Sequence, residues 1–149
     1  MEEIKVAGET AQFIVIRLGQ EQYGIDISYI ENIVRMQHIT RVPKLALYLK
    51  GVINLRGEVI PIMCLSMKMG LPVEEETKES RIIIIKMEQC GTLGLIVDEV
   101  KEVVTLDMTE QVEKLAFKKE DKSNFVQGVG KCAGGLISLL DLNAVTAEK

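Results

Sequence analysis

The chain has 149 residues and a formal net charge of −4 at pH 7, with 47% hydrophobic residues, 4% aromatic residues and no tryptophan. This length suits one ordinary domain or two small fused ones, with an aliphatic core in which methionine fills gaps. The negative charge argues against general nucleic-acid binding. Apolar runs fall short of the ~18 residues that span a bilayer, and the amino-terminal segment does not resemble a signal peptide. A cytoplasmic protein without membrane insertion is therefore expected.

The first half of the chain predicts short strands separated by turns. Runs rich in valine and isoleucine predict strands at residues 13–18, 23–27, 33–36, 52–55 and 59–65. Helical turns or short helices are expected at residues 28–32, 44–50 and 66–69. The charged segment 72–79 follows them and reads as a linker.

The same pattern returns in the second half. Residues 81–87 match 12–18, residues 94–97 match 24–27, and residues 128–142 overlay 51–65 without a gap. Repeats of about 70 residues are too long for a solenoid unit. We expect a single domain of two repeats, approximately 12–70 and 81–145, joined by the linker 72–79. Each repeat is expected to form a small β-subdomain of about five short strands, the two being related by a pseudo-two-fold axis. The polar stretch 105–124 is read as an insertion in the second repeat.

The stretch 51–65, GVINLRGEVIPIMCL, organises the first repeat. Two apolar runs flank a polar step, which predicts two strands joined by a tight turn. Gly57 supplies the turn because glycine accepts a positive φ, and its counterpart in the second repeat is Gly134. Cys64 aligns with Asp141, so one repeat keeps an acid where the other holds a thiol. We therefore expect Gly57 and Gly134 to be equivalent turn residues with positive φ.

The repeat also serves as an internal control for function. Positions shared by both halves are interpreted as structural, whereas positions that differ are free to carry a function. Arg56 aligns with Ala133, so the fold itself does not require an arginine there. Asn54 aligns with Lys131, which leads to the same conclusion more weakly. Arg56 is therefore the strongest single functional candidate.

Arg56 is the last of a series of basic residues in the first half of the chain. No acidic residue interrupts the series, which consists of Arg35, Arg41, Lys44, Lys50 and Arg56. Each of them alone would be read as an exposed, solvated side chain. Together they favour a protein surface that bears carboxylates as the partner.

Residues suited to catalysis are scarce. His38 is the single histidine and lies in a polar stretch, where solvent exposure is expected. No residues have zinc-ligand spacing, and the segment 128–130 precedes a strand rather than a helix, unlike a phosphate-binding loop. The cysteines are odd in number and lack C-x-x-C spacing, so we expect reduced thiols that pack as small core residues: Cys64, Cys90 and Cys132. We predict no enzymatic activity, no metal and no cofactor.

The segments GVINLRGEVIPI, ITRVP and YGIDISYIENI resemble the CheW family, the bacterial chemotaxis coupling proteins. The similarity runs from about Phe13 to Val145, and the NLRG core with its flanks is quite specific. It implies two SH3-like five-stranded β-barrels packed on a shared hydrophobic core, in agreement with the repeat. No kinase or receiver segment accompanies the similarity, so a stand-alone coupling protein is expected.

The resemblance implies a non-catalytic adaptor that couples methyl-accepting chemotaxis receptors to the histidine kinase CheA. It would work in the cytoplasm, at receptor arrays on the inner face of the membrane. In the family, the receptor's cytoplasmic tip lies in a groove near the NLRG segment. Carried over by position, this implies the following receptor-binding residues: Ile30, Asn32, Asn54, Leu55 and Arg56. The regulatory domain of the kinase is the second implied partner, and the resemblance does not identify the residues that bind it.

Two positions depart from the usual family pattern. Asn32 stands where many members have glutamate, which argues against a charge-based role at this position. Cys64 stands where many have aspartate, and we expect this change to alter a local hydrogen bond rather than the partner. Two alternatives stay open: a scaffold of the same fold in a related non-chemotactic pathway, or an enzyme whose site the sequence does not reveal.

Overall fold

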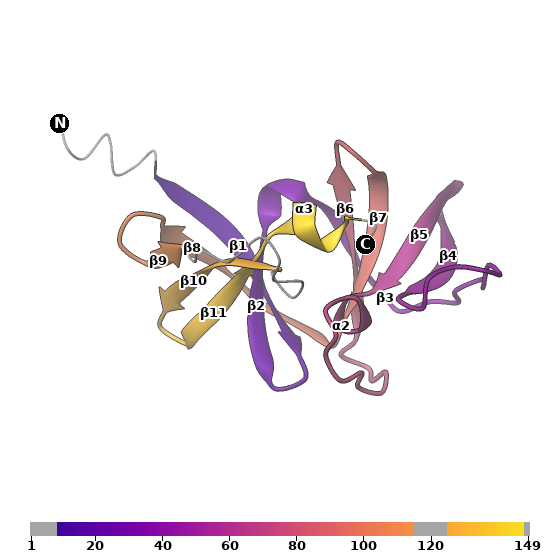
Figure 1. Ribbon diagram of the computed structural model, residues 1–149, viewed down its shortest axis with the longest axis horizontal. Coiled ribbons are helices and arrows are strands. Elements are labelled where there is room, and N and C mark those ends of the chain that lie inside the picture. Colours follow the sequence, from indigo (N-terminus) through magenta and orange to yellow (C-terminus); the bar gives the residue numbers. More distant parts are fainter. Residues whose placement is uncertain (1–8, 115–124, 148–149) are drawn as a thin grey trace. The chain divides into compact units, whose positions relative to one another are not determined.

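A computed structural model describes residues 9–114 and 125–147, and these residues form two β-sheets with a few short helices (Figure 1). A six-stranded sheet has the order β8-β1-β2-β11-β10-β9. Its strands are β1 (Thr10–Leu18), β2 (Glu21–Asp26), β8 (Glu99–Asp107), β9 (Val112–Lys114), β10 (Val126–Cys132) and β11 (Gly135–Leu140). The predicted mainly β fold with a few short helices is confirmed, although this sheet has six strands where five were expected.

The second sheet has five strands in the order β3-β6-β7-β5-β4. They are β3 (Ile30–Arg35), β4 (Leu49–Leu55), β5 (Glu58–Cys64), β6 (Arg81–Met87) and β7 (Gly91–Val97). The short helices are η1 (Ile27–Tyr29), α2 (Leu65–Lys68) and α3 (Leu142–Val145). The predicted helical turns at 28–32 and 66–69 correspond to η1 and α2 with shifted ends.

The chain forms two compact units, and these do not coincide with the two sequence repeats. The first unit holds the described parts of 1–28 and 101–149, and the second unit is Tyr29–Val100. The strand pair β1–β2 therefore joins strands of the second repeat, while β6–β7 joins strands of the first. The pair β1–β2 is connected to the strands of the second repeat by parallel pairing of β2 with β11. The pair β6–β7 is connected to the strands of the first repeat by parallel pairing of β5 with β7. The expectation that each repeat forms its own subdomain is wrong, and the repeat boundaries 12–70 and 81–145 stay a prediction about the sequence.

Each unit has its own aliphatic core. In the first unit the buried cluster consists of Phe13, Val15, Leu106, Ile137 and Leu139. In the second unit it consists of Ile53, Ile60, Ile62, Ile82 and Ile84. The run Ile82–Ile85 on β6 is buried at every position. An unbroken buried run of this kind is typical of a strand that is covered on both faces.

The segment 44–50, predicted as a helix, forms turns and the start of β4 instead. Lys44 has a φ of 66°, in the left-handed region that an α-helix of L-residues excludes. The Leu49 N–H donates to the Ala46 carbonyl at 3.0 Å, which closes a turn just before the strand. Of the predicted insertion 105–124, residues 115–124 lie outside the described part of the chain.

The hairpins β4–β5 and β10–β11 turn differently. In the first, Leu55 pairs with Glu58, and the two residues between them have positive φ, 55° at Arg56 and 84° at Gly57. Two central residues with positive φ define the type I′ turn, whose twist matches that of the flanking strands. In the second hairpin the positive φ belongs to Gly135, at 115°, and not to Gly134. The predicted equivalence of Gly57 and Gly134 is therefore wrong.

The residue three positions before each turn glycine gives a physical reason for this difference. Asn54 Oδ1 accepts a hydrogen bond from the Gly57 N–H at 3.0 Å and so holds the first turn. Its counterpart, Lys131, carries three donors and no acceptor, and cannot make this bond. The second hairpin consequently uses another turn, with its left-handed residue one position later.

Valine substitutions distinguish the two turn glycines. We expect Gly57→Val to lower the free energy of unfolding by about 1–3 kcal/mol, because it forces a β-branched residue to a positive φ. Gly134→Val is the matched control, since its φ is not in the left-handed region and no atom lies within 4 Å of its added Cβ. Its effect should stay within about 0.5 kcal/mol. Urea denaturation measures both values, and equal losses would contradict the turn assignment.

Cys64 and Asp141, which align between the two repeats, each stand at the start of a short helix. Asp141 is the N-cap of α3, and its Oδ1 accepts from the N–H groups of Asn143 at 3.1 Å and Ala144 at 3.4 Å. Cys64 is the N-cap of α2 and makes no side-chain capping bond. The replacement of an acid by a thiol thus removes a local hydrogen bond at the start of α2, as predicted.

Candidate partner-binding site

Arg56 lies exposed at the tip of the β4–β5 hairpin. It forms no ion pair with any residue that the structure describes. Its φ of 55° is a conformation that glycine and asparagine adopt at lower cost than arginine. An arginine that costs conformational energy and has no partner among the described residues favours an intermolecular role.

Asn54 and Leu55, next to Arg56, both contribute to the fold. The Asn54 side chain holds the turn through its oxygen, and Leu55 is half-buried against the core cluster of the second unit. Asn54 is exposed, and among the described residues its amide nitrogen donates no hydrogen bond. These two residues position the tip of the hairpin, while the exposed charge comes from Arg56.

Ile30 and Asn32 lie on β3, on either side of a bulge where the register with β6 shifts. Both are half-buried, and Asn32 Oδ1 accepts a hydrogen bond from the Ile33 N–H at 2.8 Å. Glu31 lies between them, and its carboxylate is 3.9 Å from the ammonium group of Lys86. The acidic group at this bulge is therefore Glu31, while the Asn32 amide bonds its own backbone.

The five predicted receptor-binding residues form two groups in the second unit. One group is on β3 and the other at the end of β4, and these are the two edge strands of the five-stranded sheet. A pair of backbone hydrogen bonds between Thr40 and Val52, at 2.8 and 2.9 Å, links the segment after β3 to β4. Among the described residues, no hydrogen bond or ion pair joins the two groups directly.

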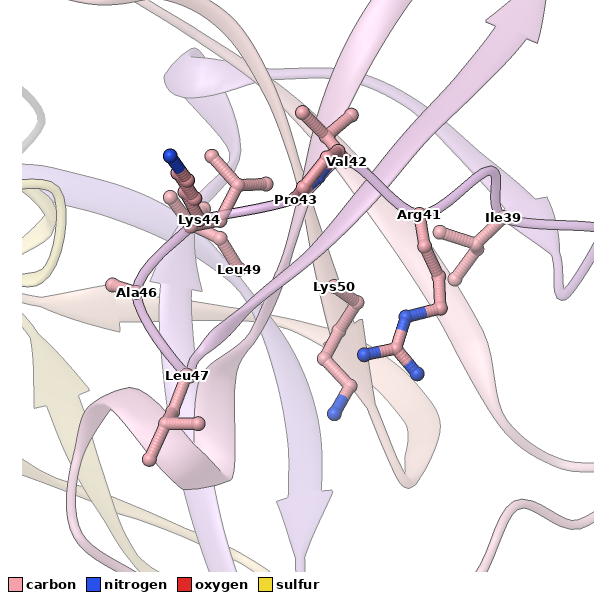
Figure 2. Close-up of a pocket in the computed structure, with 10 residues that line it drawn as sticks. Ile39, Arg41, Val42, Pro43, Lys44, Ala46, Leu47, Leu49 and Lys50 are labelled. Atoms are coloured by element: carbon pink, nitrogen blue, oxygen red, sulfur yellow. The ribbon is translucent and has the colours of Figure 1, made fainter.

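Sequence reasoning missed a groove of about 620 Å³ beside β4 (Figure 2). It is lined by Ile39, Arg41, Val42, Pro43, Lys44, Leu45, Ala46, Leu47, Leu49 and Lys50. The assignment of a helix to 44–50 concealed it, although the basic residues of this segment had been noted. Three members of the basic series, Arg41, Lys44 and Lys50, line this groove.

Both ends of the loop that forms the groove are held in place. At one end, Thr40 pairs with Val52, which requires glycine at position 51 because a Cβ there would overlap the Thr40 carbonyl oxygen. At the other end, the Tyr48 carbonyl accepts from the Cys64 N–H at 2.7 Å. The ammonium of Lys68 also lies 4.3 Å from the centre of the Tyr48 ring, a cation–π distance.

The described residues contain no group of three His, Cys, Asp or Glu residues placed to hold a metal ion, and His38 is exposed. Cys64 is buried as predicted, whereas Cys90 is exposed in a turn and not in the core. Hydrogen bonds from Thr109 lower the pKa of Asp107, and burial raises that of Tyr23.

Among the described residues, none of the helices has the length and apolar content that crossing a membrane requires. The second unit combines an exposed arginine hairpin with an apolar groove that has a basic rim, and this combination is typical of a protein-binding module. Comparison with known proteins gives a family for nearly the whole chain. The model of the CheW-like domain matches residues 12–149.

Individual relatives agree with this match. The chemotaxis protein CheW of Bacillus subtilis is 34% identical over 134 residues, which cover 90% of this chain and 85% of that protein. The CheW of Helicobacter pylori is 31% identical, over 92% of this chain and 82% of that protein. The crystal structure of the scaffolding protein TtCheW from Thermoanaerobacter tengcongensis matches with a TM-score of 0.83 and 31% identity, over 93% of this chain and 94% of that one. The chain belongs to the CheW family, and it is a chemotaxis scaffolding protein rather than an enzyme.

Proposed function

We propose that this chain bridges methyl-accepting chemotaxis receptors and the histidine kinase CheA, in arrays on the inner face of the membrane. The receptor's cytoplasmic tip would bind at the Arg56 turn, with Asn54 and Leu55 as neighbours and with Ile30 and Asn32 on the edge strand β3. The proposal depends on one observation about Arg56. This residue is exposed, has a left-handed backbone conformation, and forms no ion pair with the described residues.

The two groups would contribute different contacts. Arg56 offers a guanidinium that matches a carboxylate on the receptor in a bidentate geometry. Ile30 and Asn32 offer apolar surface and an amide, so β3 would contribute shape and packing rather than charge. The absence of an acid at position 32 does not weaken this arrangement, because β3 would contribute packing and the charge would come from Arg56.

Binding titrations test the bridging function directly. The full chain is titrated with a receptor cytoplasmic fragment, then with the kinase regulatory domain, and finally with one partner while the other is saturating. We expect saturable binding of each partner and little change in either affinity when the other is present. Competition between the two partners would contradict a bridge, and failure to bind either would contradict the coupling function itself.

A further inference from the structure

Two arginines lie directly opposite each other where β3 ends and β6 begins. Arg35 is the last residue of β3 and Arg81 is the first residue of β6, and the two are partners in the antiparallel register. Residues paired in this way carry their side chains on the same face of the sheet, where like charges destabilise the pair. Among the described residues, neither guanidinium forms an ion pair. The fold therefore keeps an unfavourable pair of charges that a bound anion would stabilise.

The arginine pair lines a pocket of about 500 Å³ within the second unit. This volume lies in the range of small-molecule sites, about 300–1,000 Å³. Lys78 contributes a third cation to the lining, and Glu76 and Glu79 contribute two carboxylates. The pocket thus combines a positively charged region with acceptors for hydrogen bonds.

Arg81 is held in place before any ligand binds. Its Nη1 donates to the carbonyl groups of Lys78 and Ser80, both at 2.8 Å. The turn that carries these carbonyls is closed by two hydrogen bonds between Thr77 and Ser80, at 2.9 and 3.1 Å. The Nε and Nη2 edge of the guanidinium forms no hydrogen bond with the described residues and can donate to a ligand. A donor fixed in this way lowers the entropic cost of binding.

The number of donors favours a phosphoryl group over a carboxylate. One guanidinium can bind both oxygens of a carboxylate in a bidentate geometry, which leaves none for a second arginine. A phosphoryl group has three terminal oxygens and can accept from Arg35 and Arg81 together. The pocket is larger than a phosphate ion, and Glu76 and Glu79 would accept from hydroxyl groups on the rest of the ligand.

We propose that this pocket binds a sugar phosphate, with the phosphoryl group on Arg35 and Arg81 and the sugar hydroxyls facing Glu76 and Glu79. Recognition by side chains of this kind needs no glycine-rich loop, so the sequence carries no phosphate-binding motif. The inference goes beyond the proposed bridging function and does not depend on it. The pocket lining also contains none of the five predicted receptor-binding residues.

Calorimetric titration of the full chain with glucose 6-phosphate tests the site, at constant ionic strength. Inorganic phosphate and succinate are titrated separately as probes for the phosphoryl group alone and for carboxylates. Arg35→Gln removes one charge of the pair, at an exposed side chain. Arg41→Gln is the matched control, because Arg41 is also exposed and does not line this pocket.

We expect saturable binding of glucose 6-phosphate that Arg35→Gln weakens about tenfold or more, while Arg41→Gln stays within about twofold. Thermal melting gives a second readout, because a ligand that binds the native state raises the melting temperature. Glucose 6-phosphate should raise it for the unsubstituted chain and for Arg41→Gln, and much less for Arg35→Gln. Without ligand, Arg35→Gln should melt at the same temperature or higher, since the like-charge repulsion is gone.

Three results would overturn the inference. The first is the lack of saturable binding of glucose 6-phosphate, and the second is equal affinity in Arg35→Gln and the unsubstituted chain. The third is binding of succinate or inorganic phosphate as tight as that of glucose 6-phosphate, which would contradict the sugar phosphate as the ligand.

Discussion

Replacing Arg56 by glutamate is expected to weaken binding of the receptor fragment by about 2–5 kcal/mol, the usual cost of breaking a charge pair that an interface buries. The substitution turns an attractive contact with a receptor carboxylate into a repulsive one. Folding should be nearly unaffected, because Arg56 is exposed and has no ion-pair partner among the described residues. Titration with the receptor fragment and thermal melting of the same protein provide the two measurements.

Two companion variants separate charge from backbone conformation. Lys131→Glu makes the same charge change on an exposed strand of the first unit and should leave receptor binding intact. Arg56→Asn removes the charge but places a residue that tolerates the left-handed region at a φ of 55°. It should bind the receptor weakly while melting at the same temperature or higher. Unfolding of Arg56→Glu would show that Arg56 is structural, whereas a folded protein with normal affinity would place the receptor site elsewhere.

The largest loss of stability is expected for Gly51→Ala. Gly51 has a φ of 141°, and an added Cβ would overlap the carbonyl group of Thr40, a backbone group that has little freedom to move. The substitution combines backbone strain of about 1–3 kcal/mol with disruption of the two Thr40–Val52 hydrogen bonds, each worth about 0.5–1.5 kcal/mol. Urea denaturation should therefore show a loss of about 3 kcal/mol or more in the free energy of unfolding.

Gly134→Ala is the matched control, because its position combines open space with an ordinary φ. It should change the free energy of unfolding by less than about 0.5 kcal/mol. A loss of stability below 1 kcal/mol would mean that the Thr40 bridge contributes little to the second unit.

The sequence by itself determined the features that depend on neighbouring residues. Alternating and continuous apolar runs predicted most of the strands, and Gly57 predicted the tight turn that places Arg56 at a hairpin tip. Proline's missing N–H predicts an edge or a bulge at Pro61, and this residue lies where β5 pairs with β4 alone, since pairing with β7 begins at Ile62. Each of these conclusions follows from local chemistry: side-chain shape, glycine's freedom at positive φ, and proline's missing N–H.

The tertiary structure decided which strands pair and where the exposed surfaces lie. The strand pairs β1–β2 and β6–β7 each join strands of the other repeat, and the hydrophobic pattern of a strand does not specify which repeat it packs against. The groove depends on the contact between Thr40 and Val52, twelve residues apart, which no local pattern specifies. Helical propensity at 44–50 was overridden because the chain must bend there, with Lys44 left-handed, to bring Leu49 into β4. Local preferences amount to a few tenths of a kcal/mol per residue, and the pairing of a whole strand outweighs them.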